Sequence, residues 1–206
     1  MLRELERKGR DLANIAVKAL EDAKFLSELL NGLYSKKDTV RSNCFQVIYH
    51  ISEKNPHILY NEWDFFVSLL ESDNAYHKLI AVRILANLTC TDRENRFEAL
   101  FDQYYYLLND SVIVAGHLAA GSGTIAKAKP ELRSKITQRL LSIDKTMQKH
   151  KDLVKAYVID AFNEYFSEAE NKGKILQFVR EQLNRSSPKT RNKAKQFLRA
   201  WTDSPL

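Results

Sequence analysis

Apolar residues recur along this chain in one spaced pattern, which is repeated five times. Each copy places apolar or small side chains at relative positions i, i+3, i+4 and i+7, which is one face of an α-helix. The first copy consists of Cys44, Val47, Ile48 and Ile51. The later copies are Ala81, Ile84, Leu85, Leu88; Gly116, Ala119, Ala120, Gly123; Val158, Ala161, Phe162, Tyr165; and Ala194, Phe197, Leu198, Trp201. We call each copy a ladder, and the pattern predicts helices with equivalent apolar faces.

A second helical stretch lies between consecutive ladders. Its apolar stripes are Leu59, Trp63, Phe66, Leu70; Phe97, Phe101, Tyr104, Leu108; Leu132, Ile136, Leu140, Ile143, Met147; and Ile175, Val179, Leu183. Polar residues stand where helices should start, so we expect Asp38 and Asp110 to be N-caps and Thr91 with Glu94 to form a capping box. The sequence has no hairpin dipeptide and no sustained alternation of polar and apolar residues, which predicts almost no strand.

Two further helices precede the first ladder, over roughly residues 12–20 and 25–33, and depart from the repeated pattern. An atypical terminal pair is typical of the capping unit of a repeat array. The sequence therefore predicts one domain over residues 1–206. It would consist of a capping pair at 1–37, repeats at 38–73, 74–109, 110–150 and 151–186, and a terminal helix at 187–201.

The ladders recur every 35 to 42 residues, and the segment Asp-x-Val-Arg opens the first of them at Asp38. This period and this motif resemble those of HEAT repeats, the armadillo-like α-solenoid family, over roughly residues 38 to 201. The resemblance implies an all-α, right-handed α-solenoid of about eleven antiparallel helices. It also implies that the second helix of each pair lines the concave side, where a partner would bind.

Composition adds little to this picture, because 44% hydrophobic and 28% charged residues with a mean hydropathy of -0.41 are typical of a globular protein. No apolar run approaches the roughly 20 residues that span a membrane. The chain begins with residues of alternating charge where a signal peptide would place its apolar stretch, so we expect a cytoplasmic protein. The sequence leaves the oligomeric state open.

Few residues have the spacing that catalysis, cofactors or metals require. The stretch from Gly116 to Gly123 lacks Gly-Lys-Ser/Thr and lies within a predicted helix, so its small residues should allow close helix packing rather than phosphate binding. The histidines and cysteines lack metal-ligand spacing, and Cys44 and Cys90 should be independent thiols. No nucleophile, base and orienting group stand together. We therefore predict no catalytic, cofactor-binding or metal-binding residue, and no enzyme activity.

Three consecutive tyrosines, Tyr104 to Tyr106, predict an exposed aromatic surface. Three successive helical residues cover about 200° of the helix, more than an apolar stripe can bury. Tyr104 continues the stripe of Phe97 and Phe101, which leaves Tyr105 and Tyr106 as contact residues or, for one of them, as a packing residue with a locally bonded hydroxyl. The predicted partner-binding residues are Tyr105, Tyr106, Lys135 and Arg139.

Positive charge is concentrated at the C-terminal end of the chain. Residues 171–201 contain nine Lys or Arg and one Glu, whereas the whole chain has a net charge of +6. Such a segment is typical either of a patch that binds phosphates or an acidic protein, or of the polar cap that ends a repeat array. The patch would comprise Lys172, Arg180, Arg185, Lys189, Arg191, Lys193, Lys195 and Arg199.

Together these features favour a non-catalytic scaffold that holds a protein or peptide in its concave groove through aromatic anchors and complementary charge. The alternative is nonspecific, salt-sensitive binding of nucleic acid phosphates by the basic C-terminal end. A HEAT-like DNA glycosylase is a third class, and it would need a basic concave surface that holds a carboxylate.

Overall fold

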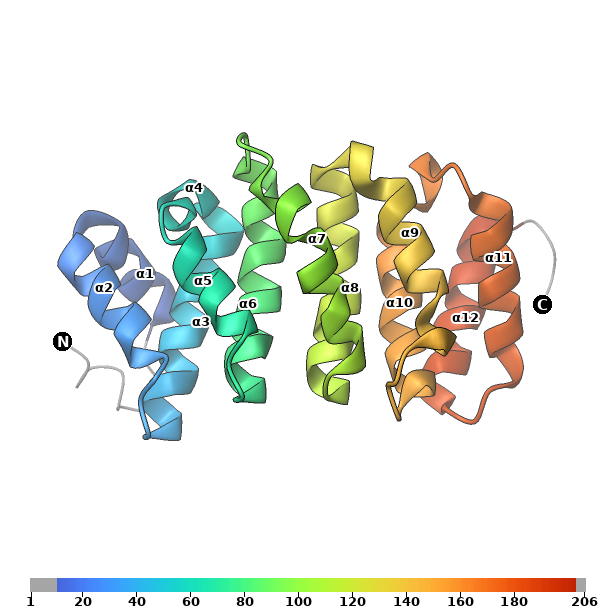
Figure 1. Cartoon of the computed structure of the whole chain (residues 1–206), viewed down its shortest axis with the longest axis horizontal. Helices are drawn as coiled ribbons and strands as arrows, with labels where there is room; N and C mark the ends of the chain where they lie inside the picture. Colours follow the sequence, from blue (N-terminus) through green and yellow to red (C-terminus); the bar gives the residue numbers. More distant parts are fainter. Residues whose placement is uncertain (1–10, 203–206) are drawn as a thin grey trace.

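The computed structural model describes residues 11–202, which form α-helices and short 3-10 turns without any strand in that range (Figure 1). The α-helices, twelve rather than about eleven, are α1 (Leu12–Glu21), α2 (Ala23–Gly32), α3 (Asp38–Lys54), α4 (Pro56–Tyr60), α5 (Trp63–Leu70), α6 (Ala75–Leu88), α7 (Arg96–Tyr106), α8 (Val112–Ala128), α9 (Arg133–Leu141), α10 (Lys151–Tyr165), α11 (Lys172–Glu181) and α12 (Pro188–Trp201). The extra helix arises because the stretch between the first two ladders is divided into α4 and α5. The molecule is an all-α solenoid, and its repeat boundaries stay our prediction.

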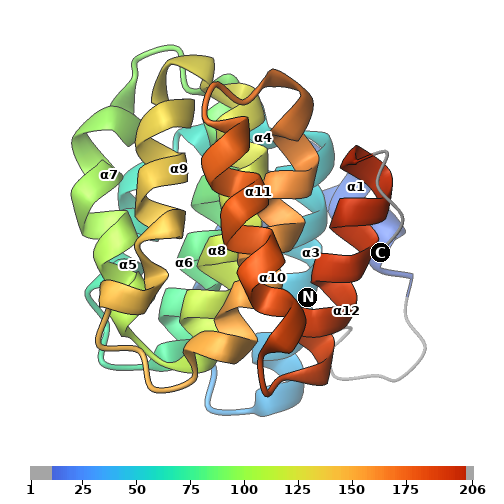
Figure 2. The same cartoon turned by 90° about the vertical axis from the view of Figure 1, so that its right-hand side faces the viewer.

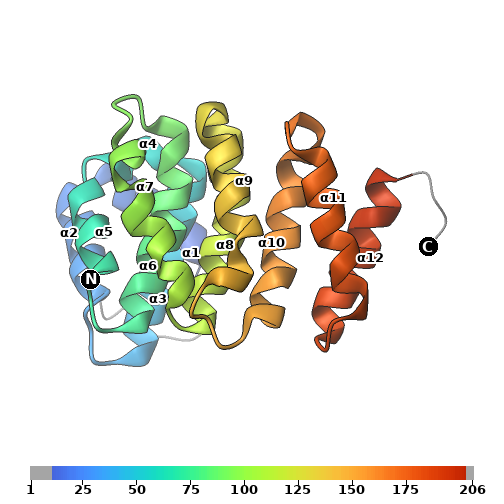
Figure 3. The ribbon, with the colours of Figure 1, turned by 45° about the vertical axis from the view of Figure 1, so that its right-hand side comes forward.

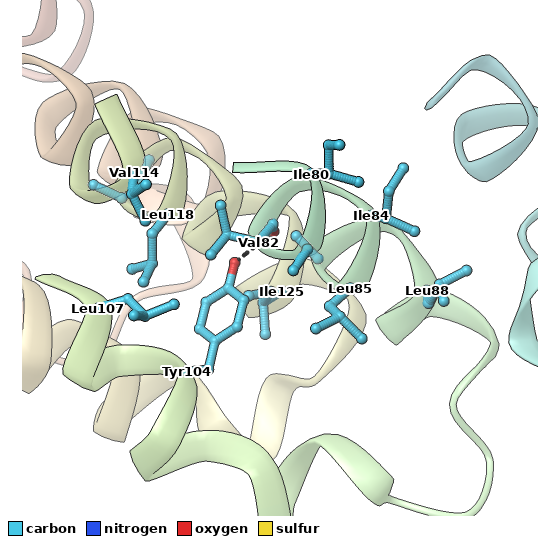
Figure 4. Packing of buried hydrophobic residues seen from close by; sticks show 14 of the residues in the cluster. Ile80, Val82, Ile84, Leu85, Leu88, Tyr104, Leu107, Val114, Leu118 and Ile125 are labelled. Atoms are coloured by element: carbon cyan, nitrogen blue, oxygen red, sulfur yellow. Dashed lines mark hydrogen bonds between the residues drawn. The ribbon is translucent and has the colours of Figure 1, made fainter. Parts of the chain in front are cut away.

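Most ladder residues form the interior, as their spacing predicts, but Trp201 at the end of the last ladder is 37% exposed. Ile48 of α3, Leu85 of α6, Phe162 of α10 and Leu198 of α12 are all buried. Side chains of α6, α7 and α8 meet in the middle of the stack, where Tyr104 points between the two ladder helices (Figure 4). Each ladder helix thus packs mainly on its neighbours, as in other repeat proteins.

Helix α8 approaches its neighbours closely because it is rich in glycine. A Cβ atom on Gly121 would lie 3.0 Å from the Cβ of Ala86 in α6, and a Cβ atom on Gly116 would lie 3.0 Å from the ring of Tyr157 in α10. A Cβ on Gly123 would lie even closer to Glu164. The expectation that these small residues serve helix packing is confirmed.

Several helix starts differ from the predicted caps. The N-cap of α8 is Ser111, whose hydroxyl accepts from the Val114 N–H, and Asp38 is the first residue of α3 rather than its cap. Asp110 instead accepts a hydrogen bond from Lys78 Nζ at 2.7 Å. The sequence pattern located these polar residues near helix ends but could not tell capping from contact with a neighbouring repeat.

The start of α7 is held by a buried carboxylate rather than by the expected Thr91–Glu94 capping box. Asp92 accepts hydrogen bonds from the backbone N–H groups of Arg96 and Phe97, at 2.9 and 3.0 Å. The ammonium group of Lys129, also buried, lies 3.2 Å from Asp92 Oδ2 and donates to the Asp92 carbonyl. Burial alone would raise the pKa of Asp92, but these hydrogen bonds, together with one from the Tyr60 hydroxyl, outweigh it and lower that pKa.

The helices form two layers, one of which contains α3, α6, α8, α10 and α12 and is called the ladder layer here. The outer layer contains α5, α7, α9 and α11 (Figure 3). Viewed along the stack, α8 is displaced toward the outer layer relative to α3 and α12, so the ladder layer bows and its free side is concave (Figure 2). The expectation that the second helices line the concave side is therefore wrong.

Candidate partner-binding face

One hollow on the ladder layer is bordered by four successive helices of that layer. Its lining residues are Tyr49 of α3; Arg83, Ala86 and Asn87 of α6; His117, Ala120, Gly121 and Thr124 of α8; and Glu164 of α10. Its volume is about 500 Å³ up to and including its open mouth. Helices so far apart in sequence can border one hollow because the ladder layer curves around it.

We use the name cation–aromatic row for five side chains on this face, one from each helix of the ladder layer. The row consists of Tyr49, Arg83, His117, Tyr157 and Lys189. Arg83 lies 34 residues after Tyr49, and His117 lies 34 residues after Arg83. These spacings are shorter than the 37 and 35 residues between the corresponding ladders, so the members of the row are not equivalent positions of the repeat.

Aromatic rings hold both cations of the row in place. The guanidinium carbon of Arg83 lies 3.8 Å from the ring centroid of Tyr49 and 5.3 Å from that of Phe45. At the other end, Lys189 Nζ lies 3.6 Å from the ring centroid of Tyr157. Such cation–π contacts restrict a long side chain while leaving its charge intact.

The carboxylates beside the row are paired with other lysines. Glu164, which borders the hollow, lies 3.3 Å from Lys127 Nζ, measured at Oε2. Asp160 Oδ1 lies 2.8 Å from Lys193 Nζ. Within residues 11–202, neither Arg83 nor Lys189 forms an ion pair with a carboxylate. Positive charge is consequently left over on this face.

His117 lies between the two cations of the row. Its ring centroid lies 6.2 Å from that of Tyr157. Burial lowers the pKa of His117, and the positive charges of Arg83 and Lys189 lower it further. The imidazole is therefore neutral near pH 7, where it can donate one hydrogen bond and accept another.

The four predicted contact residues lie on the outer layer and not in the concave groove. For Tyr105 the expectation of a contact residue is wrong and the alternative of a packing residue is confirmed, because its side chain is 3% exposed and its hydroxyl donates to Ser122 Oγ of α8 at 3.0 Å. Tyr106 is 65% exposed, as the three-tyrosine argument requires of at least one of them. Lys135 and Arg139 of α9 are partly exposed, and both pair with Asp102 of α7.

Another hollow, of about 980 Å³ up to and including its open mouth, lies on the outer layer around these residues. It is bordered by Tyr106 of α7, Arg139 of α9 and the turns that follow each helix. Met147, which we expected in the buried stripe of α9, is 72% exposed close by and donates its N–H to Asn109 Oδ1. The chain leaves α9 at Ser142, so the helical spacing no longer applies to Met147.

The basic C-terminal residues lie on two helices and the turn between them, and several have partners within the chain. Arg191 donates to the carbonyl groups of Arg185 and Ser186, Lys193 pairs with Asp160, and Lys189 belongs to the row. Exposed members are divided between α11 of the outer layer and α12 of the ladder layer; they are Lys172, Arg180, Lys195 and Arg199. Residues 171–201 are strongly basic, but their charged side chains are divided among α11, α12 and the turn between them.

Residues 11–202 contain neither a cluster of metal-binding side chains nor a helix that could span a membrane. No group of His, Cys, Asp and Glu side chains in that range is arranged to hold a metal ion. None of the helices there combines the length and the apolar character needed to cross a bilayer. Cys44 is buried and Cys90 is exposed, and the two do not form a disulfide.

Comparison with solved structures identifies the fold. A designed armadillo repeat protein superposes with a TM-score of 0.57 and 18% identity, covering 98% of each chain. A second structure, titled an engineered protein and a structural genomics target, gives a TM-score of 0.59 and 19% identity over 96% of this chain and 95% of that chain. No protein-family model and no curated protein matches the sequence. The chain has an armadillo-like helical repeat fold.

Proposed function

We propose that this protein is a non-catalytic scaffold that binds a segment of a protein partner on its concave face. The observation that carries the proposal is the hollow that four successive ladder helices share. Armadillo-like repeat folds commonly serve as protein-binding scaffolds, and repeat arrays present extended concave surfaces for that purpose. Tyr49 and His117 border the hollow and remain partly accessible, which suits a surface that contacts a partner.

The lining of the hollow favours a polypeptide over a small molecule. Small-molecule sites are mostly enclosed and lined by apolar side chains. This hollow is open along the groove and is lined by Arg83, Asn87, Thr124 and Glu164. A long polar groove is suited to a chain that crosses several repeats.

Selection from a library of displayed peptides tests the proposal. Peptides enriched on the wild-type protein should lose binding to Ala120→Trp, which fills the hollow, and to Thr124→Trp as a second variant. Ala99→Trp is the matched control, because Ala99 is exposed on α7 of the outer layer. Circular dichroism and thermal unfolding of each variant verify the fold. Enriched peptides that bind every variant equally would refute the proposal.

Nucleic acid binding through the C-terminal end is the alternative function. Residues 171–201 supply its charge, and exposed Lys195 and Arg199 lie on α12. The division of the basic side chains between two layers supports it less well, because a phosphate backbone follows one continuous positive surface. This function predicts binding of a single-stranded oligonucleotide that falls steeply between about 50 and 200 mM salt.

A DNA glycosylase has weaker support. The concave face does contain cations and carboxylates, but Glu164 is paired with Lys127 and Asp160 with Lys193. The rings of Tyr49 and Tyr157 are already covered by cations. The groove therefore offers neither an unpaired acid nor an uncovered ring on which to stack a base.

A further inference from the structure

The cation–aromatic row identifies the chemistry of the partner. We infer that the concave face binds an extended, acidic polypeptide segment whose carboxylates pair with Arg83 and Lys189. This inference rests on the proposed scaffold function and deepens it. The charge balance of the face, the geometry of the row and the length of the groove support it separately.

The charge balance excludes a basic partner. The two carboxylates beside the row, Asp160 and Glu164, already have lysine partners at 2.8 and 3.3 Å. Arg83 and Lys189 have none within the described part of the chain, so a partner carboxylate would meet cations whose charge is not yet neutralised. A basic segment would instead have to displace Lys127 or Lys193 from its existing ion pair.

The geometry of the row prepares both cations for binding. Tyr49 and Phe45 lie beneath the guanidinium of Arg83, and Tyr157 lies beneath the ammonium of Lys189. A cation held against a ring has lost part of its side-chain entropy before a partner arrives, which lowers the cost of ordering it on binding. A guanidinium with its plane on a ring also keeps N–H groups free at its edge for a bidentate carboxylate.

His117 adds a neutral hydrogen-bonding group between the two cations. Because Arg83 and Lys189 both depress the pKa of its imidazole, each of them acts electrostatically on the centre of the row. Glu164 and Lys127 are the other charged groups nearby, and they neutralise each other.

The length of the groove indicates an extended segment. Neighbouring helices lie about 10 Å apart, so a chain that crosses from Arg83 on α6 to Lys189 on α12 covers about 30 Å. An extended polypeptide spans that distance with about nine residues at about 3.3 Å each. Its alternate side chains would point toward the row.

Fluorescence anisotropy with labelled peptides tests the inference. The probe is a peptide of about nine residues in which Glu alternates with Ser, and its counterpart has Lys in place of each Glu. A single-stranded oligonucleotide of similar negative charge is the third ligand. We expect the acidic peptide to bind at least about tenfold more tightly than either of the others at 150 mM salt.

Two double variants with equal charge change separate the row from the overall charge. Arg83→Gln with Lys189→Gln should weaken binding of the acidic peptide about tenfold or more. Arg180→Gln with Lys174→Gln removes one Arg and one Lys from α11 of the outer layer and should change the dissociation constant less than about twofold. His117→Gln, which keeps a hydrogen-bonding group, should have an intermediate effect.

Three outcomes would overturn the inference: equal losses in the two double variants, tighter binding of the basic peptide, and tighter binding of the oligonucleotide. The library selection separates failure of the inference from failure of the proposed function. If selected peptides are sensitive to Ala120→Trp but are neutral or basic, the scaffold function stands and the acidic partner is wrong. If no selected peptide is sensitive to that change, both are wrong.

Discussion

Each layer of the solenoid contains a cation that lies over an aromatic ring. In one of these two contacts a carboxylate neutralises the cation, and in the other no carboxylate within residues 11–202 does. In the outer layer, Lys135 lies 4.0 Å from the ring centroid of Phe101 and also pairs with Asp102. In the ladder layer, Arg83 lies over Tyr49 without a carboxylate partner in the described range. A ring can position a cation on either face, but of these two cations only Arg83 keeps its charge for another molecule. Charge that the fold itself does not use is therefore the better guide to the binding face.

The strongest test of this comparison concerns a cation that is both buried and paired. Asp92→Asn removes the carboxylate beside Lys129 and leaves that ammonium without a counter-charge. We expect the free energy of unfolding to fall by about 3 kcal/mol or more, because breaking a buried pair leaves an uncompensated charge. Urea denaturation measures the effect, and Asp92→Asn with Lys129→Met should recover part of it. A loss below about 1 kcal/mol would show that the buried pair of Asp92 and Lys129 contributes no more than an exposed ion pair does.

The pH dependence of stability should show the contribution of the same carboxylate, Asp92, without a mutation. The pKa of Asp92 is lowered from its ordinary value of 3.8, so its charge stabilises the fold above that pH. That stabilisation is lost as the pH falls below 3.8 and passes through the lower pKa of the folded state. The unfolding free energy of the wild type should therefore drop more between pH 6 and pH 3 than that of Asp92→Asn. Equal losses of unfolding free energy in the wild type and in Asp92→Asn would contradict a stabilising role of the Asp92 carboxylate.

Tyr105 and Tyr106 allow a comparison between a buried and an exposed side chain, for which we expect smaller changes in unfolding free energy. Tyr105→Phe removes the buried hydrogen bond to Ser122 and should cost about 1 kcal/mol of unfolding free energy. Tyr106→Phe should change stability by less than about 0.5 kcal/mol, since the side chain is exposed. Thermal and urea unfolding of both variants check this order. If Tyr106→Phe is the more damaging change, the outer surface around it is more structured than the hydrogen bonds indicate.

The smallest effect is expected for the outer-layer ion pairs. Asp102→Asn frees Lys135 and Arg139 from their shared carboxylate, but all three side chains are largely exposed. The unfolding free energy should change by less than about 1 kcal/mol. The same substitution should let an acidic peptide bind weakly to the outer layer, detectable by anisotropy at low salt. No new binding would mean that an unneutralised cation is insufficient without a groove.

The sequence predicted the helices and their buried faces well, because an i, i+3, i+4, i+7 pattern depends only on the geometry of one helix. It failed where the outcome depends on several helices at once. Tyr105 is buried because α7 packs on both α6 and α8: Tyr104 donates to the Val82 carbonyl of α6, whereas Tyr105 reaches Ser122 of α8. Two neighbours widen the buried arc beyond one stripe, and no single-helix pattern contains that information.

The concave side was missed for a related reason. Curvature follows from small rotations between repeats, which the pattern within one repeat does not specify. Tyr49, Arg83 and His117 lie off the ladder at different positions within the repeat, so no fixed repeat spacing in the sequence marks them. Their chemical types differ, so a search for identical residues overlooks them.

The glycine at position 116 makes the groove adjustable by a single methyl group. A side chain there would press on the ring of Tyr157, which in turn supports the ammonium of Lys189. Gly116→Ala would act as a wedge between two adjacent repeats and shift one end of the row relative to the other. A protein built in this way can acquire a partner of different length or charge spacing without any change in its own contact residues.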